Sequence, residues 1–197
     1  MANYERTLKS CIWTSGEFEG LSNIEKLFYI LIHTGEETSD CCIFQITPKR
    51  IAYHLGISTK KAEELINKFV DLNFIVYDFR TQEMLVVDYM RHNAPKGGLL
   101  YENYKKDFAK IKTKPLINEL AEIAKEYVVT IGFLAALDDY TPINVDEYKY
   151  RPTKETLESA RHVQKRGRDA AAQKRKNESE DTYCEDTYDD DLADIPF

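Results

Sequence analysis

The chain has 197 residues, of which 43% are hydrophobic and 31% charged, and its formal net charge is −7. This length suits one ordinary domain with a tail or two very small domains, and the apolar content excludes a wholly disordered protein. No apolar run approaches the roughly 20 residues of a transmembrane helix, and the first residues carry no secretion signal, so the sequence predicts a cytoplasmic protein without a membrane partner.

The first strong helix signal begins at Ser22. Ser22 and Glu25 have the spacing of a capping box, in which both side chains accept hydrogen bonds from free backbone N–H groups at a helix start. Apolar residues then recur at helical spacing: Ile24, Leu27, Phe28, Leu31 and Ile32. A core helix is therefore predicted from Ser22 to about Gly35.

A short strand and two more helices are predicted next. Residues 42–46 place apolar side chains at alternate positions, which is typical of a strand. Thr47 and Pro48 are the residue types of an N-cap and a first helical residue, and Gly56 is expected to end that helix. Ser58 caps another helix with one apolar face. Two helices joined by such a short turn predict a helix-turn-helix.

A β-hairpin is predicted directly after the second helix of this pair. Residues 72–79 and 84–89 have strand composition, and residues 80–83 are predicted as a polar turn. A hairpin in this place is the wing of a winged helix. The sequence therefore predicts an α+β protein in which residues 1–98 form a winged helix-turn-helix DNA-binding domain.

The rest of the chain divides into three segments by composition. Residues 99–148 are predicted to form a helical extension, broken into two pieces near Pro115. Residues 149–176 contain 10 Lys and Arg against 3 Asp and Glu, and predict a basic flexible neck. Residues 177–197 contain 9 acidic residues and no basic one, and predict a disordered acidic tail. Because the acidity is concentrated in the tail, the net charge does not exclude a nucleic-acid partner.

The outward face of the second helix is the first candidate site. In a helix-turn-helix, the first residues of this helix contact base edges in the major groove, and neighbouring cations contact phosphates. The predicted DNA contacts in this domain are Lys49, Arg50, Ser58, Thr59, Lys60, Lys61, Lys68 and Arg80, the last at the wing tip. The alternative is a protein-interaction module with solvated lysines, which Glu63 and Glu64 favour because they weaken the attraction for DNA.

The basic neck is the second candidate. Each phosphate that a cation neutralises releases a counterion, so a cluster of cations would give strongly salt-dependent binding. The predicted contacts there are Arg161, Lys165, Arg166 and Arg168. The alternative is a solvated linker whose charge balances the acidic tail.

The C-terminal residues are the third candidate, as a protein-docking tip. Phe197 offers a side chain to an apolar pocket and a carboxylate to a basic residue, while Pro196 restricts the backbone and lowers the cost of ordering it. The predicted partner-binding residues are Asp189, Asp190, Asp191, Asp194, Ile195, Pro196 and Phe197. Acidic tails in general serve only solubility, which is the alternative.

Enzyme and metal chemistry are not indicated. The four histidines are scattered, and the four cysteines have neither the spacing of a zinc site nor the number of a disulfide scaffold. No phosphate-binding loop, nucleophile elbow or carboxylate pair is recognisable. We expect no catalytic residue, no metal and no cofactor.

Residues 11–93 resemble the N-terminal winged-helix domain of phage replisome organisers and related DnaD-like replication initiators. The features that carry the resemblance are Ile12-Trp13-Thr14 with Phe18, the helix from Ile24 to Ile32, Thr47-Pro48-Lys49-Arg50-Ile51-Ala52, Leu55-Gly56-Ile57-Ser58 and Asp88-Tyr89-Met90-Arg91-His92-Asn93. Such proteins bind origin DNA and help to load the replicative helicase. After about Gly98 no second helicase-interaction domain is recognisable.

The last nine residues resemble the C-terminal tip of bacterial single-stranded DNA-binding proteins, an acidic run that ends in Ile/Leu-Pro-Phe. In that family the tip recruits replication, recombination and repair enzymes. The predicted helices of the rest of the chain differ from the five-stranded barrel of that family. The resemblance therefore implies a docking signal and not a shared fold.

Together these features predict a phage-type replication protein in a bacterial host cell. Its winged helix would bind DNA, more readily duplex than single-stranded, and its tip would recruit host replication or repair proteins. One alternative is a single-stranded DNA-binding protein without the barrel. Another is a decoy that uses the tip to occupy those host proteins without binding DNA. The sequence leaves the oligomeric state open.

Overall fold

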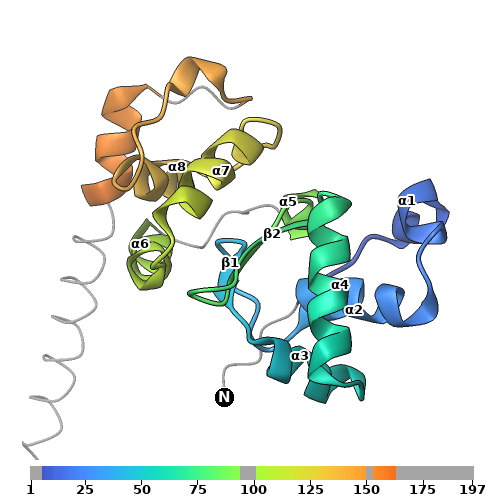
Figure 1. Cartoon of the computed structure of the whole chain (residues 1–197). Helices are drawn as coiled ribbons and strands as arrows, with labels where there is room; N and C mark the ends of the chain where they lie inside the picture. Colours follow the sequence, from blue (N-terminus) through green and yellow to red (C-terminus); the bar gives the residue numbers. More distant parts are fainter. Residues whose placement is uncertain (1–5, 94–100, 150–152, 163–197) are drawn as a thin grey trace, which may run out of the picture. The chain divides into compact units, whose positions relative to one another are not determined.

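The computed structural model describes residues 6–93, 101–149 and 153–162 (Figure 1). These residues form an α+β structure, as the sequence predicts, in which the helices accompany one three-stranded antiparallel sheet. No helix of these described ranges is both long and apolar enough to cross a membrane.

The chain begins with two short helical turns and then a long helix. A 3-10 helix, η1 (Ser10–Thr14), and a single turn, α1 (Gly16–Glu19), precede α2 (Asn23–Thr34). The predicted capping box is present: the backbone N–H of Ser22 donates to Glu25 at 2.9 Å. The core helix predicted in this region is therefore confirmed.

The two helices predicted after the first strand are α3 (Pro48–Leu55) and α4 (Thr59–Asp71). Thr47 caps α3 by accepting from the backbone N–H of Arg50 at 3.0 Å, and Ser58 caps α4 by accepting from that of Lys61 at 3.2 Å. Gly56 ends α3 in the left-handed conformation, with φ of +64°, which a residue with a Cβ adopts only with strain. The chain can therefore turn within three residues.

The sheet consists of β1 (Ile43–Gln45), β2 (Ile75–Asp78) and β3 (Glu83–Val86), in the order β1-β3-β2. Ile43 pairs with Leu85, and Ile75 pairs with Val86. Both hairpin strands are shorter than predicted. Residues 72–74 form a turn that includes the left-handed Asn73, at φ of +57°, so β2 begins only after it.

Two residues of the predicted hairpin have a different structure. Glu83, predicted in the polar turn, begins β3 and is only 4% exposed. Tyr89, predicted at the end of the returning strand, begins the short helix α5 (Tyr89–Asn93). Both residues have polar partners elsewhere in the chain, which periodicity within one segment does not reveal.

One apolar core lies between the helices and the sheet. Phe28 of α2 and Phe69 of α4 meet edge to face with ring centroids 4.6 Å apart, and both are completely buried. Aromatic contacts of this kind contribute to stability beyond the area that they bury. Because α4 turns its apolar face toward this core, its opposite face is left at the surface.

The helical extension consists of α6 (Tyr101–Lys110), α7 (Lys114–Ala124), α8 (Ile131–Asp138) and a 3-10 turn, η2 (Val145–Glu147). The predicted break near Pro115 is confirmed, since α6 ends before it and α7 contains it in its first turn. Phe133 of α8 packs edge to face on Tyr104 of α6 at 5.2 Å. Five consecutive residues of α8, from Phe133 to Leu137, are buried, so this helix forms the centre of the extension.

The described part of the predicted neck is a helix at residues 154–162. Leu157 is buried within it, and the side chain of Arg161 bonds to α8 and to the residue after it. This segment therefore differs from the flexible neck predicted for residues 149–176. The rest of the predicted neck, from residue 163 on, and the whole acidic tail lie outside the described residues.

Candidate nucleic-acid interface

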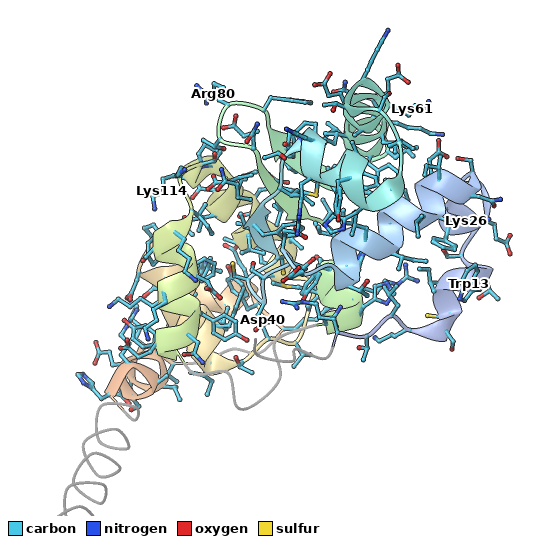
Figure 2. All side chains as sticks on the ribbon, turned by 90° about the horizontal axis from the view of Figure 1, so that it is seen from below. Trp13, Lys26, Asp40, Lys61, Arg80 and Lys114 are labelled. Carbon is cyan, nitrogen blue, oxygen red and sulfur yellow. The ribbon has the colours of Figure 1, made fainter. Side chains whose placement is uncertain are left out.

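The first turn of α4 presents polar side chains to solvent. Thr59, Lys60 and Lys61 are all exposed, while Ala62 behind them is buried. Figure 2 shows Lys61 on the outer side of α4. Ser58 is exposed as well, but its hydroxyl already accepts the backbone N–H of Lys61 as the helix cap. The structure therefore leaves one threonine and two lysines here for an external ligand.

These two lysines differ in their contacts. Lys61 donates to Glu64 at 3.0 Å across one helical turn, and both side chains are half-exposed. Such a surface pair contributes about 0–1 kcal/mol, so a phosphate could replace the carboxylate at little cost. Within the described residues, Lys60 has no carboxylate at ion-pair distance, and the same holds for Lys49 at the start of α3.

Arg50 and Lys68 are more firmly engaged. Arg50 donates to Glu37 and lies 3.6 Å from Glu36, in the segment that follows α2. Lys68 donates to Glu25 at 2.8 Å and so joins α4 to the first turn of α2. The hydrogen bond from Lys68 lowers the pKa of Glu25, against the effect of burial. For these two predicted DNA contacts, binding a phosphate would mean exchanging an existing partner.

Arg80 lies at the tip of the β2–β3 hairpin, and its side chain is 90% exposed. Among the described residues its one ion pair is a long one, at 3.5 Å to Asp78. In Figure 2 Arg80 and Lys61 lie well apart on the described part of the chain. A ligand that contacts both would therefore be held at two separate places.

Arg161 has a structural role in the helix at residues 154–162. It donates to Asp138 at 2.8 Å, to Asp139 at 3.1 Å and to the carbonyl of Ala135 at 3.2 Å. These bonds satisfy one carbonyl group in the last turn of α8 and the two aspartates at its end, where a cation is favourable. The guanidinium group of Arg161, a predicted DNA contact, is therefore already engaged at the end of α8.

The remaining predicted site residues lie outside the described part of the chain. They are Lys165, Arg166 and Arg168 of the neck and Asp189, Asp190, Asp191, Asp194, Ile195, Pro196 and Phe197 of the tip.

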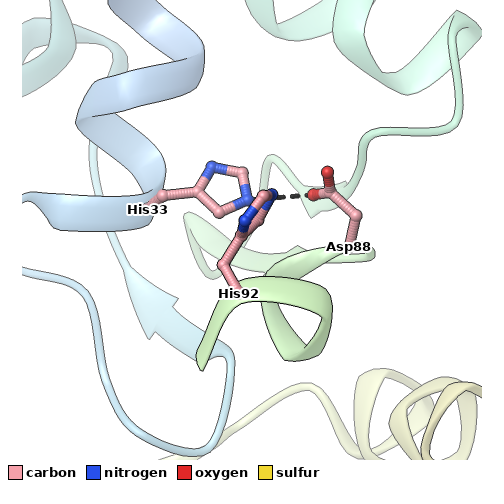
Figure 3. A group of neighbouring side chains, drawn as sticks. All are labelled: His33, Asp88 and His92. Atoms are coloured by element: carbon pink, nitrogen blue, oxygen red, sulfur yellow. Dashed lines mark hydrogen bonds and ion pairs between the residues drawn. The ribbon is translucent and has the colours of Figure 1, made fainter. Parts of the chain in front are cut away.

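A buried polar cluster that the sequence did not predict lies between α2 and α5 (Figure 3). It consists of His33, Asp88 and His92, and each offers one potential metal-ligand atom, a ring nitrogen or a carboxylate oxygen, within 4.8 Å of the other two. His33 is completely buried and His92 is 4% exposed. Two imidazoles and a carboxylate are a ligand set that zinc uses, so the hydrogen bonds of each ring decide between a metal centre and a structural network.

The backbone fixes the protonation of His92. Its Nδ1 accepts the backbone N–H of Lys9 at 3.1 Å, so that nitrogen carries a lone pair and the proton of the neutral ring is on Nε2. Nε2 then donates to the hydroxyl of Tyr29 at 3.3 Å, and Tyr29 in turn donates to Asp88. A metal ion would need the lone pair of Nε2, which this arrangement does not provide.

His33 lies between two acceptors. Its Nδ1 is 2.8 Å from the carbonyl oxygen of Tyr29, and its Nε2 is 2.9 Å from the carboxylate of Asp88. Both partners are hydrogen-bond acceptors, so both ring nitrogens of His33 are engaged within the protein. Every donor in the cluster therefore has an acceptor, which favours a structural network over a metal centre.

The network also determines the electrostatics of Asp88. Burial alone would raise the pKa of this carboxyl group, but the hydrogen bonds from His33 and Tyr29 and the charge of His33 outweigh it, and the pKa is lowered. For His92, burial and the neighbouring charge of His33 lower the pKa. Both effects favour a charged Asp88 beside a neutral His92.

Comparisons of the chain with protein-family models, with curated proteins and with solved structures found no match. A function for this chain therefore has to be inferred from its own residues.

We predict that Asp88→Asn lowers the free energy of unfolding by roughly 1–3 kcal/mol near pH 6, because the buried side chains of His33 and Tyr29 lose their charged acceptor. Urea denaturation of the full chain measures this change. Asp71→Asn is the control, since Asp71 is exposed at the end of α4. Equal stability of the two variants would contradict the network.

The same comparison has an expected pH dependence. The folded pKa of Asp88 lies below its ordinary value of 3.8, so its contribution is fully present above that value and is lost as the pH falls through the folded pKa. The difference in stability between the wild type and Asp88→Asn should therefore stay nearly constant down to about pH 5 and narrow below about pH 4.

Proposed function

We propose that this chain is a DNA-binding replication protein of the phage replisome organiser type, in which residues 1–98 form a winged helix. The order of elements supports this: α2, β1, α3, a short turn, α4 and then the β2–β3 hairpin. In a winged helix of this order, α4 is the recognition helix and the hairpin is the wing.

The exposed first turn of α4 is the observation that carries the proposal. Recognition helices contact base edges with their N-terminal residues, where Thr59, Lys60 and Lys61 are exposed. A lysine donates to the O6 and N7 atoms of guanine, and a threonine hydroxyl can donate or accept. Lys49, which has no ion pair within the described residues, would contact phosphate at the start of α3.

Duplex DNA fits this surface better than a single strand. Proteins that bind single strands stack successive bases on aromatic side chains, but the one aromatic residue of α4, Phe69, is completely buried. The exposed aromatic residues Trp13, Tyr53 and Phe79 lie in η1, on α3 and in the hairpin turn. They are the residues on which the alternative, single-stranded DNA binding without a barrel, would depend.

We further propose that the Asp189–Phe197 tip recruits host replication or repair proteins. The support for this step is the sequence of the tip, because these residues lie outside the described part of the chain. The competing proposal, a decoy that binds only those host proteins, predicts the same tip interaction without DNA binding. DNA affinity therefore separates the replication protein from the decoy.

The substitution of Lys60 and Lys61 together by Ala should weaken binding to duplex DNA and reduce the slope of log affinity against log salt by about one to two, because up to two counterions fewer are released. Fluorescence anisotropy with duplex and single-stranded DNA at several salt concentrations measures both quantities. The matched control is Lys9→Ala with Lys106→Ala, two exposed lysines on other elements. An unchanged slope in the α4 variant would place the DNA contact elsewhere.

Two further outcomes of the same measurement separate the alternatives. Binding that grows with the length of a single strand and is weak on duplex would favour the single-stranded DNA-binding protein. Absence of binding to both forms at low salt would leave the decoy.

A companion variant, Glu63→Gln with Glu64→Gln, should tighten duplex binding, because it removes two negative charges from the same helix.

Deletion of Phe197 should abolish binding to host proteins that recognise the single-stranded DNA-binding protein tip, because the terminal side chain and carboxylate are then displaced. The affinity for duplex DNA should stay unchanged. Pull-down from a bacterial extract with full-length and shortened chains, read out with antibodies to known tip-binding enzymes, tests this. Equal capture by both chains would contradict the docking role.

A further inference from the structure

The turn between α6 and α7 is joined to the tip of the hairpin by a group of polar contacts. The buried carboxylate of Glu83 accepts the backbone N–H groups of Lys112 at 2.8 Å and Thr113 at 2.7 Å. The hydroxyl of Thr113 lies 2.6 Å from that of Thr81 and donates to Asp78 at 3.0 Å. Residues 78–83 and 112–113 are therefore held together although about 30 positions separate them in the sequence.

These contacts turn the negative charges of the region inward. Burial alone would raise the pKa of Glu83, but the hydrogen bonds from the two backbone N–H groups outweigh this effect and the pKa is lowered. Glu83 is therefore charged, and its carboxylate is bound to the turn that precedes α7. The carboxylate of Asp78 likewise accepts hydrogen bonds, from the backbone N–H of Arg80 and from the hydroxyl of Thr113, and its side chain is only 14% exposed.

The cations of the same region point outward. Arg80, Lys112 and Lys114 are all exposed, and we call these three residues the wing-side surface. Figure 2 shows Arg80 and Lys114 on the same side of the described structure. Lys114 lies 4.8 Å from the ring centroid of Tyr140, and within the described residues neither Lys112 nor Lys114 has a carboxylate at ion-pair distance. The surface is therefore positive although Glu83 and Asp78 lie behind it.

The other carboxylates that line the pocket beside Glu83, those of Glu37 and Asp107, are each paired with a cation. Asp107 is paired with Lys110 at 2.7 Å one turn before the end of α6, so that pair is neutral as a unit. Phe79, next to Arg80, is about half-exposed and adds an apolar contact beside the cations. An array of cations with an aromatic side chain at its edge suits the phosphates and sugars of a nucleic acid.

We propose that the wing-side surface is a second DNA-contacting surface, which binds backbone phosphates flanking the site that α4 contacts. This inference rests on the proposed DNA binding and extends it to residues of the helical extension. It gives the extension a role in binding: the contacts to Glu83 fix Lys112 and Lys114 beside the wing before DNA arrives, so less side-chain and loop ordering is needed on binding. The expected footprint on DNA is therefore longer than a winged helix alone would give.

The test is the double variant Lys112→Ala and Lys114→Ala in the full chain. It should weaken duplex binding about tenfold at low salt and reduce the salt slope by about one to two. Hydroxyl-radical footprinting should show protection lost at one flank of the site, while the centre stays protected. The control is Lys105→Ala with Lys106→Ala, which removes two lysines from the neighbouring helix α6.

The outcomes distinguish this inference from the proposal on which it rests. If Lys60→Ala with Lys61→Ala weakens binding but Lys112→Ala with Lys114→Ala matches the α6 control, only the wing-side surface is overturned. If the wild type binds no duplex at low salt, both are overturned. Weakening with loss of the flank supports the inference, whereas weakening with uniform loss along the whole site overturns it. Thermal melting within a few degrees of wild type shows that each variant is folded.

Discussion

The buried carboxylate of Glu83 is the constraint on which the arrangement of the hairpin depends. A charged group in the sheet is costly unless hydrogen bonds compensate it, and here the donors are the backbone N–H groups of the two residues that precede α7. The charge therefore orders the turn before α7 and fixes the hairpin against the helical extension. A neutral residue at this position would remove the cost of burial and also the reason for α7 to begin beside the hairpin.

The cluster around Asp88 follows the same physical principle at the other end of β3. One carboxylate accepts from His33 and Tyr29 of α2, and His92 of α5 completes the network through Tyr29 and the backbone of Lys9. The segment before η1, α2 and α5 are thereby joined by hydrogen bonds of defined direction. Because each ring nitrogen has one assigned role, the network specifies the position of α5 more sharply than apolar packing alone would.

The sequence predicted those features whose signals are local. The capping residues Ser22, Thr47 and Ser58 and the glycine at position 56 determine where helices begin and end, and the structure places the boundaries there. The sequence did not predict Glu83 or the histidine cluster, because the contacts that define them join residues 29 to 83 positions apart in the chain. A polar residue beside a strand has the same appearance in sequence whether it faces water or a distant helix end, and only the tertiary fold decides between them.

The same distinction applies to the candidate interface. The sequence identifies a cationic side chain but not its partner, so it predicts Lys60 and Arg161 alike as DNA contacts. The structure separates them: Lys60 is exposed at the first turn of α4, whereas Arg161 is bound to the acidic end of α8. A cation that must first leave a partly buried carboxylate contributes less net affinity to DNA than one that leaves only water. The cations at the start of α4 and on the wing-side surface are therefore better placed to bind phosphate than Lys68 or Arg161, although all of them carry the same charge.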